Sequence, residues 1–417
     1  MNETVNTYAS HLFRENYGKM VSYLSQQYGY QEIDNIIDAV QEAFEVALIK
    51  WRFSGLPDKP LAWLFKVANN KLLNQLKKAN THKRHIQGIS TNKQIDAIEE
   101  KEFDDSLFRL LLLFSKLRFK ERNKIIISLY FLCGFGYAEI AAALFLNAEA
   151  VKKVILRSKD SIKQFTLKHS DNLNATDGTD LGCLVRILYL MFNEGYKSAK
   201  KNETIDLSLC YEAIRLGKMV AGFEKENRQI NALIALMFFN TSRFPARIKE
   251  NTWISLEEQD RSLWNKELIS EGFYYLREAK NNQDKLNKYY LEALISSLHC
   301  IAPTYADTDW LSISFLYHQL ENIEPNSITI KLNRIIAESN YKAIVLLIDE
   351  LKDMEPAITE GFFTYYSCLA YLYAKNKQLN KAYEYYNLCM SYSRNKADQN
   401  FIGQKLKALK KHLNIKK

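Results

Sequence analysis

The chain has 417 residues, of which 47% are apolar and 25% charged, a composition typical of globular proteins. Its length predicts about two to four domains. The formal net charge is +9; residues 1–170 carry 25 Lys and Arg against 18 Asp and Glu, whereas residues 171–417 carry 32 against 30. No basic leader with an apolar core and no apolar run of about 18 residues occurs, which argues against secretion and membrane insertion. We therefore expect a cytoplasmic protein whose N-terminal part binds a polyanion.

Turn-forming residues are scarce, with 14 Gly and 6 Pro, and no run of alternating strands occurs, so the sequence predicts an all-α protein. The six cysteines never form a C-x-x-C pair, and His82 and His85 lie in a polar basic segment without acidic neighbours. We expect reduced, mostly buried thiols and neither a metal site nor a cofactor. The sequence also lacks a phosphate-binding Gly-rich loop and the common hydrolase motifs, so we do not expect an enzyme.

The first strongly periodic segment predicts a helix over residues 33–51, because its apolar positions recur every three or four residues. Its opposite face is acidic and polar. That face contains Asp34, Asp38, Gln41, Glu42 and Glu45.

A second helix is predicted from Pro60, whose fixed φ and missing N–H suit the first helical position. The side chains outside its apolar stripe are basic, amide or indole. They are Trp63, Lys66, Asn69, Asn70, Lys71, Asn74, Lys77 and Lys78. Trp63 has two readings: an anchor packed between helices, or a ring that stacks on a base. The polar residues 81–103 are then predicted to form a flexible linker.

Residues 104–168 predict four helices, the last two as a helix-turn-helix over 137–144 and 148–163. Asn147 is expected to cap the second of these helices. Its outward face would carry Lys152, Lys153, Arg157 and Lys159. This face suits a recognition helix in a major groove, and equally an ordinary solvated helix.

After a second linker over 169–180, residues 181–417 predict stacked helix pairs with an irregular stretch at 242–260. Near the end, one unit has the spacing of a tetratricopeptide repeat, without its terminal Pro. Its positions are Tyr366, Leu369, Ala370, Tyr373, Ala382, Tyr386 and Cys389. Stacked repeats of this kind form a superhelix with a concave surface.

Several strings resemble extracytoplasmic-function sigma factors of the sigma-70 family. The strings similar to the polymerase-docking and −10-reading regions are Asp38-Ala-Val-Gln-Glu-Ala-Phe44, Pro60-Leu-Ala-Trp-Leu64 and Ala68-Asn-Asn70. The string similar to the −35-reading region is Ala138-Glu-Ile-Ala141, followed by Val151, Lys152 and Arg157. This resemblance covers about residues 25–165.

Further strings resemble the sigma-factor subgroup with a C-terminal extension of tetratricopeptide-like repeats. They are Leu188-Tyr-Leu-Met-Phe-Asn-Glu-Gly-Tyr196, Glu212-Ala-Ile-Arg-Leu216, Glu258-Gln-Asp-Arg261 and Ala306-Asp-Thr-Asp-Trp310. With these strings the resemblance extends over nearly the whole chain. It implies region 2 over 1–80, region 4 over 104–168 and a helical extension over 181–417.

The resemblance implies core RNA polymerase and promoter DNA as partners. The residues implied to dock on polymerase are Asp38, Gln41, Glu42 and Glu45. Those implied to hold the −10 element are Trp63, Lys66, Asn69, Asn70, Lys71, Asn74 and Lys77, and those implied to read the −35 element are Asn147, Lys152, Lys153, Arg157 and Lys159. Family members often carry Arg at the position of Asn69 and Asp at that of Asn74, so base preference here departs from the family pattern.

The extension is expected to regulate activity through a regulatory protein or through contact with the rest of the chain. Its candidate surface consists of Asn193, Glu194, Arg247, Asp260, Arg261, Asp309 and Trp310. These residues either line a binding surface or tie the repeats together, and we favour ties, also for Trp264. Gly195 is expected to end a helix in the left-handed conformation.

One rival interpretation is a helix-turn-helix activator with a repeat scaffold that recruits polymerase without being its subunit. This interpretation gives no role to residues 25–80. Transcription with purified core polymerase separates the two, because an activator would still require another sigma subunit.

Overall fold

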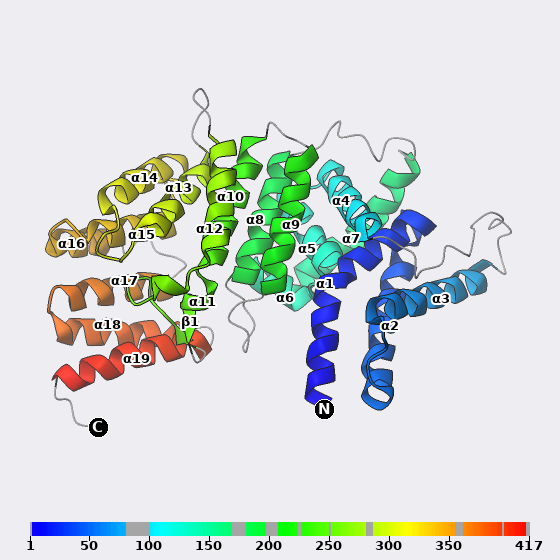
Figure 1. The fold of residues 1–417 in the computed structure, drawn as a ribbon, viewed down its shortest axis with the longest axis horizontal. Coiled ribbons are helices and arrows are strands. Elements are labelled where there is room, and N and C mark those ends of the chain that lie inside the picture. The colour runs from blue at the N-terminus through cyan, green and yellow to red at the C-terminus, as the bar shows by residue number, and fades with distance from the viewer. Residues whose placement is uncertain are drawn as a thin grey trace. The chain divides into compact units, whose positions relative to one another are not determined.

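The structure is a computed structural model that describes residues 2–80, 100–144, 146–168, 181–196, 207–223, 227–249, 252–280, 287–354, 362–393 and 396–413. The described residues are almost entirely helical, which confirms the all-α prediction (Figure 1). They form two compact units, Met1–Lys197 with Asp206–Val220, and Ser198–Ile205 with Ala221–Lys417.

The first unit begins with α1 (Asn2–Tyr28), the short 3-10 helix η1 (Tyr30–Glu32), α2 (Ile33–Ser54) and α3 (Pro60–Asn80). Gly29 and Gly55 follow α1 and α2 with φ of 91° and 74°, a conformation that costs glycine little and other residues more. The predicted apolar stripe of α2 is almost wholly buried against α1 and α3. Pro60 opens α3, as predicted.

The next helices are α4 (Glu100–Lys116), α5 (Glu121–Cys133), α6 (Tyr137–Ala143) and α7 (Ala148–Lys168). The predicted helix-turn-helix is therefore present as α6 and α7. Asn147 caps α7 as expected, because its Oδ1 accepts a bond of 2.8 Å from the backbone N–H of Glu149. Ile140, Val151 and Ile155 are fully buried where the two helices meet α5.

These two groups of helices share one core, because α1 packs on α4 and α5 as well as on α2. At Gly18, an added Cβ would lie 2.0 Å from the backbone oxygen of Leu132, so only glycine allows this approach of α1 to α5. Phe103 stacks on Phe65 of α3, with ring centroids 4.5 Å apart.

The predicted linker over 81–103 is therefore wrong at its end, since α4 already begins at Glu100 and Phe103 is buried. Residues 81–99, with His82 and His85, and the second predicted linker over 169–180 lie outside the described residues.

Helix α8 (Leu181–Tyr196) and most of α9 (Leu207–Phe223) also belong to the first unit, and α8 packs on α4 and α5. The compact units therefore divide the chain later than the boundary predicted at residue 181. Gly195 is a buried residue within α8 and does not have the positive φ expected of a left-handed cap. Tyr196 is the last residue of α8, so the left-handed conformation predicted for Gly195 is wrong, whereas the predicted helix end lies beside the observed one.

The second unit begins with α10 (Arg228–Ser242), α11 (Phe244–Arg247), the strands β1 (Ile248–Lys249) and β2 (Thr252–Trp253), the 3-10 helix η4 (Arg261–Leu263) and α12 (Lys266–Glu278). The irregular stretch of the sequence thus contains a small antiparallel hairpin. Helix α10 packs on α12, where Gly272 lies directly beneath the ring of Phe239.

The remaining helices are α13 (Lys288–Ile301), α14 (Trp310–Ile323), α15 (Ile328–Glu338), α16 (Ile344–Met354), α17 (Phe362–Lys375), α18 (Leu379–Ser391) and α19 (Lys396–Leu413). Neighbours in sequence pack as pairs, most extensively α14 with α15 and α17 with α18. This arrangement agrees with the predicted stacked helix pairs.

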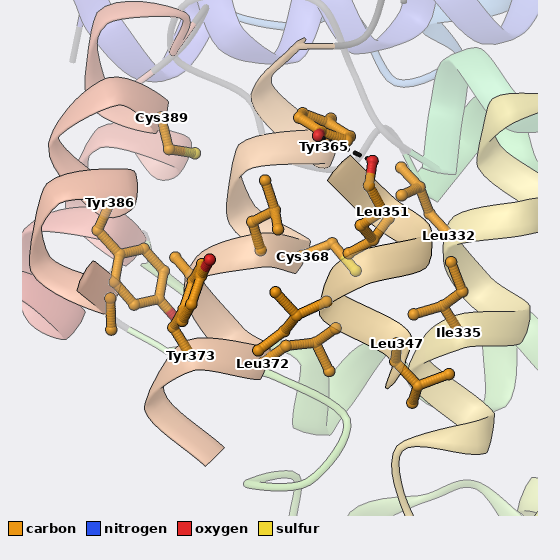
Figure 2. Close-up of a cluster of buried hydrophobic side chains, with 14 of the residues drawn as sticks. Leu332, Ile335, Leu347, Leu351, Tyr365, Cys368, Leu372, Tyr373, Tyr386 and Cys389 are labelled. Carbon is orange, nitrogen blue, oxygen red and sulfur yellow. Dashed lines mark hydrogen bonds between the residues drawn. The ribbon is translucent and has the colours of Figure 1, made fainter. Parts of the chain in front are cut away.

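The predicted tetratricopeptide-like unit corresponds to the hairpin of α17 and α18 (Figure 2). Its small and aromatic positions form one buried cluster, with only Tyr366 partly exposed. The hydroxyl of Tyr365 donates a bond of 3.0 Å to the backbone oxygen of Leu351, which joins α17 to α16.

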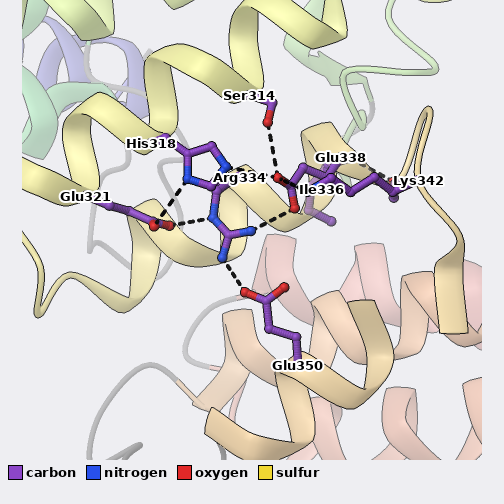
Figure 3. Close-up of polar contacts among 9 residues, drawn as sticks. Ser314, His318, Glu321, Arg334, Ile336, Glu338, Lys342 and Glu350 are labelled. Carbon is purple, nitrogen blue, oxygen red and sulfur yellow. Dashed lines mark hydrogen bonds and ion pairs between the residues drawn. The ribbon is translucent and has the colours of Figure 1, made fainter. Parts of the chain in front are cut away.

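A charged network joins α14, α15 and α16 (Figure 3). The guanidinium of Arg334 contacts Glu321 and Glu338 at 2.7 Å each, and also Glu350. Burial opposes the charge of Arg334, but the bonds to Glu350 and Glu321 outweigh burial and raise its pKa. Glu338 is fully buried and also contacts Lys342 at 2.7 Å.

Candidate nucleic-acid interface

The N-terminal half of α7 presents a cationic face. Lys152, Lys153 and Arg157 are exposed, and none of them forms an ion pair with another described residue. The buried stripe of the helix, Val151 and Ile155, lies on the opposite side and fixes which residues face outward. The outward side of this half of α7 thus consists of three cations that are open to solvent, and phosphate binding there stays a prediction.

Lys159 is placed differently from the prediction. Its Nζ lies 2.7 Å from Oδ1 of Asp34, Lys163 pairs with the other oxygen of the same carboxylate, and only 14% of the Lys159 side chain is exposed. Burial would raise the pKa of Asp34, but the hydrogen bonds from Lys159 and Lys163 outweigh burial and hold it below its ordinary value. Lys159 therefore ties α7 to the start of α2 and does not extend the cationic face.

On the predicted −10 face of α3, some residues are likewise open to solvent and others are paired within the fold. Lys66, Asn70, Asn74 and Lys77 are exposed to solvent. This subset forms the open part of the face and keeps both cations and amides. Amides and cations in this arrangement can bond base edges and neutralise phosphates.

The other three predicted −10 residues have partners within the fold. Asn69 accepts a hydrogen bond of 2.6 Å from the hydroxyl of Tyr28. Lys71 pairs with Glu42 at 2.8 Å. The half-buried ring of Trp63 lies 5.5 Å from that of Trp51, which supports the reading of Trp63 as a packing anchor.

The predicted docking face of α2 is mostly open. Asp38, Gln41 and Glu45 are exposed, whereas Glu42 is half-buried against Lys71 and Gln75. Glu42 therefore also holds α2 to α3. Its pairing removes one cation from the −10 face and one anion from the docking face.

Two apolar side chains continue this stripe of α2 and were missed in the sequence. Ile49 is 63% exposed and Phe53 is 88% exposed, and both follow Glu45 at helical spacing. The sequence did indicate their exposure, because both apolar residues lie outside the buried stripe of α2 that ends at Trp51. Such exposed apolar residues are common at protein interfaces.

The candidate residues of the extension mostly form ties within the fold. Arg261 donates to the backbone oxygens of His299 and Ala302 at 2.8 and 2.6 Å, at the C-terminal end of α13, and to Thr308 at 3.0 Å. Burial, together with the nearby cations of Arg243 and Arg261, lowers the pKa of His299 to about 3. The imidazole is therefore neutral in this cationic surrounding.

Most of the remaining candidates also form contacts within the fold. Asp260 caps η4 and Asp309 caps α14, each by accepting a backbone N–H at 2.9 and 3.0 Å. Arg247 lies over the ring of Trp253, and the ring of Trp310 packs beside His299 and Tyr305. Trp264 is buried beneath Arg243 and Arg261. Asn193 and Glu194 are half-buried on α8 in the first unit.

Within the described part of the chain, no three His, Cys, Asp or Glu side chains lie close enough to hold a metal ion. The cysteines in these ranges form no disulfide, and all except Cys300 are buried. No described helix combines the length and apolarity that crossing a bilayer requires. The first unit instead carries two exposed faces suited to a polyanion: the cations of α7 and the lysines and amides of α3.

Residues 181–280 match a family of unknown function (DUF6596). Over 367 residues, the chain is 27% identical to an uncharacterised protein of Rhizobium meliloti (strain 1021), and the alignment covers 85% of this chain and 84% of that protein. No solved structure matches the chain significantly.

Proposed function

We propose that this chain is a sigma subunit of bacterial RNA polymerase, of the extracytoplasmic-function type with a helical C-terminal extension. The observation that supports the proposal best is the exposed, unpaired cationic face formed by Lys152, Lys153 and Arg157 on the second helix of a helix-turn-helix. The same compact unit carries the open amide and lysine face of α3. A cytoplasmic location follows from this role.

In this role the two faces have different tasks. The N-terminal half of α7 would lie in the major groove of the −35 element, with its cations on the phosphate walls. Lys66, Asn70, Asn74 and Lys77 of α3 would hold the −10 element by contacts to phosphates and base edges. Asp38, Gln41 and Glu45 of α2 would dock on core polymerase, and the exposed Ile49 and Phe53 would extend that contact.

The second unit would act as an accessory part that regulates activity or binds a partner. The ties of Arg261, Asp260 and Asp309 favour a rigid scaffold over a polar binding surface at those residues. A truncation that tests this role should end after Gly222 and not after Lys168. Helix α8, which packs on α4 and α5, and α9 would then remain with the first unit.

The deciding experiment is run-off transcription with purified core polymerase, no other sigma subunit, and a promoter library. The full chain should start transcription from a defined set of promoters. Transcription that appears only after another sigma subunit is added would support the activator interpretation instead. Failure of the pure chain to associate with core polymerase would contradict the proposal.

A further inference from the structure

A leucine lies within the cationic face of α7. Leu156 is 51% exposed. The side of α7 that packs on the core is formed by other residues, the fully buried Val151, Ile155 and Ile162. Exposed leucines also occur elsewhere in the chain, so exposure alone does not indicate a role. What distinguishes Leu156 is its position among exposed cations.

The position of Leu156 on the helix surface is specific. Successive residues of an α-helix turn by about 100°, which places Leu156 between Lys152 on one side and Lys153 and Arg157 on the other. All three cations are exposed. The face therefore has an apolar side chain flanked by charges that can bind two phosphate walls.

This arrangement matches one feature of the DNA major groove. Phosphates border the groove on both sides, and its floor carries one apolar group, the 5-methyl of thymine. A side chain between the phosphate-binding cations points toward the floor. Leucine has no hydrogen-bonding group, so among base edges only the methyl group offers it a favourable contact.

We infer that Leu156 reads a thymine in the −35 duplex by contacting its 5-methyl group. The inference rests on the proposed function and names one base that the α7 face selects. Lys152, Lys153 and Arg157 supply affinity for the phosphates, and Leu156 supplies part of the sequence preference.

The test uses the full chain with core polymerase and a −35 duplex selected from a library. Each thymine is replaced in turn by deoxyuridine, which lacks only the methyl group, and binding is measured by fluorescence anisotropy. One replacement should weaken binding by the wild-type chain about fourfold, the effect of losing one buried methyl contact. Leu156→Ala should weaken binding to the thymine duplex similarly and should abolish the difference between thymine and deoxyuridine at that position.

Leu167→Ala is the matched control, because Leu167 is a 64% exposed leucine on the same side of the same helix, about 16 Å further along the axis and beyond Lys152, Lys153 and Arg157. It should keep the full thymine preference. A thymine preference that survives in Leu156→Ala overturns the inference, as does a wild-type chain that binds the duplex without any methyl dependence. Loss of polymerase association by Leu156→Ala with unchanged DNA preference also overturns it, since Leu156 would then contact protein. If the wild-type chain with polymerase binds no duplex, the proposed function fails together with the inference.

Discussion

Oδ1 of Asp34, in the first turn of α2, lies 2.7 Å from Nζ of Lys159 in the C-terminal half of α7. The other oxygen of the carboxylate pairs with Lys163, 129 residues away in sequence. One carboxylate thus neutralises two cations of the helix-turn-helix. It ties the C-terminal half of α7 to the start of α2 and leaves the cations of the N-terminal half open to solvent.

We expect Asp34→Asn to destabilise the first unit at pH 7, because two lysines lose their carboxylate. The side chain of Asp34 is 40% exposed, so solvent screening limits the loss to about 1 kcal/mol in denaturant unfolding. Because folding lowers the pKa of Asp34, the stabilisation is complete above the unfolded value near 3.8 and disappears as pH falls through the folded value. Wild type and variant should therefore converge in acid. Asp58→Asn, an exposed carboxylate in the same unit, should have no effect, and equal stability of both variants at pH 7 would contradict the prediction.

Neutralising Lys152, Lys153 and Arg157 together should weaken binding of duplex DNA and reduce its dependence on salt. Each phosphate contact contributes about 0.9 to the slope of log K against log salt, so the slope should fall by up to about 3. Anisotropy titrations at several salt concentrations measure both quantities. The control removes Lys407, Lys410 and Lys411, which are exposed on α19. A larger loss of DNA affinity in that control would place the DNA contact elsewhere.

Gly18→Ala should destabilise the first unit by about 2 kcal/mol, because its Cβ would lie 2.0 Å from the Leu132 oxygen and the backbone of α5 would have to move. Gly222→Ala is the matched control on another helix. An added Cβ there meets nothing within 4 Å, and alanine is the better helix former, so about 0.5–1 kcal/mol of stabilisation is expected. Thermal unfolding of the two variants should shift in opposite directions; a shift of the same sign would show that the α1–α5 contact is looser than described.

Arg334→Ala should destabilise the second unit by about 1–2 kcal/mol, because Glu338 would lose its guanidinium partner but keep Lys342. Denaturant unfolding measures the loss. Asn333→Ala on the same helix is exposed and should change stability by less than about 0.5 kcal/mol. Comparable losses in the two variants would contradict the assignment of the loss to the charged network, since alanine itself favours the helix.

Local features of the sequence predicted the helices well. Periodicity located α2 and its buried stripe, Pro60 marked the start of α3, and Asn147 marked the start of α7. Each of these signals depends on residues within one or two helical turns of each other. Local spacing therefore suffices to predict them.

Contacts between distant segments could not be predicted in this way. Nothing near Lys159 in sequence indicates Asp34, and nothing near Asn69 indicates Tyr28. Gly195 was expected to be left-handed, but it is helical and lies in the last turn of α8, so its local signal indicated the helix end and not its own conformation. The sequence alone therefore could not show that Lys71 and Lys159 are paired within the fold and do not belong to the open part of each candidate face.

The close approach of α1 to α5 at Gly18 has a consequence for how the first unit opens. Because α1 contributes to the core beside α2 and α3 and also beside α4 and α5, neither helix group can come apart without exposing that shared helix. The slowest-exchanging amide protons of α1, α2 and α5 should report a common opening energy, as expected for a single cooperative unit.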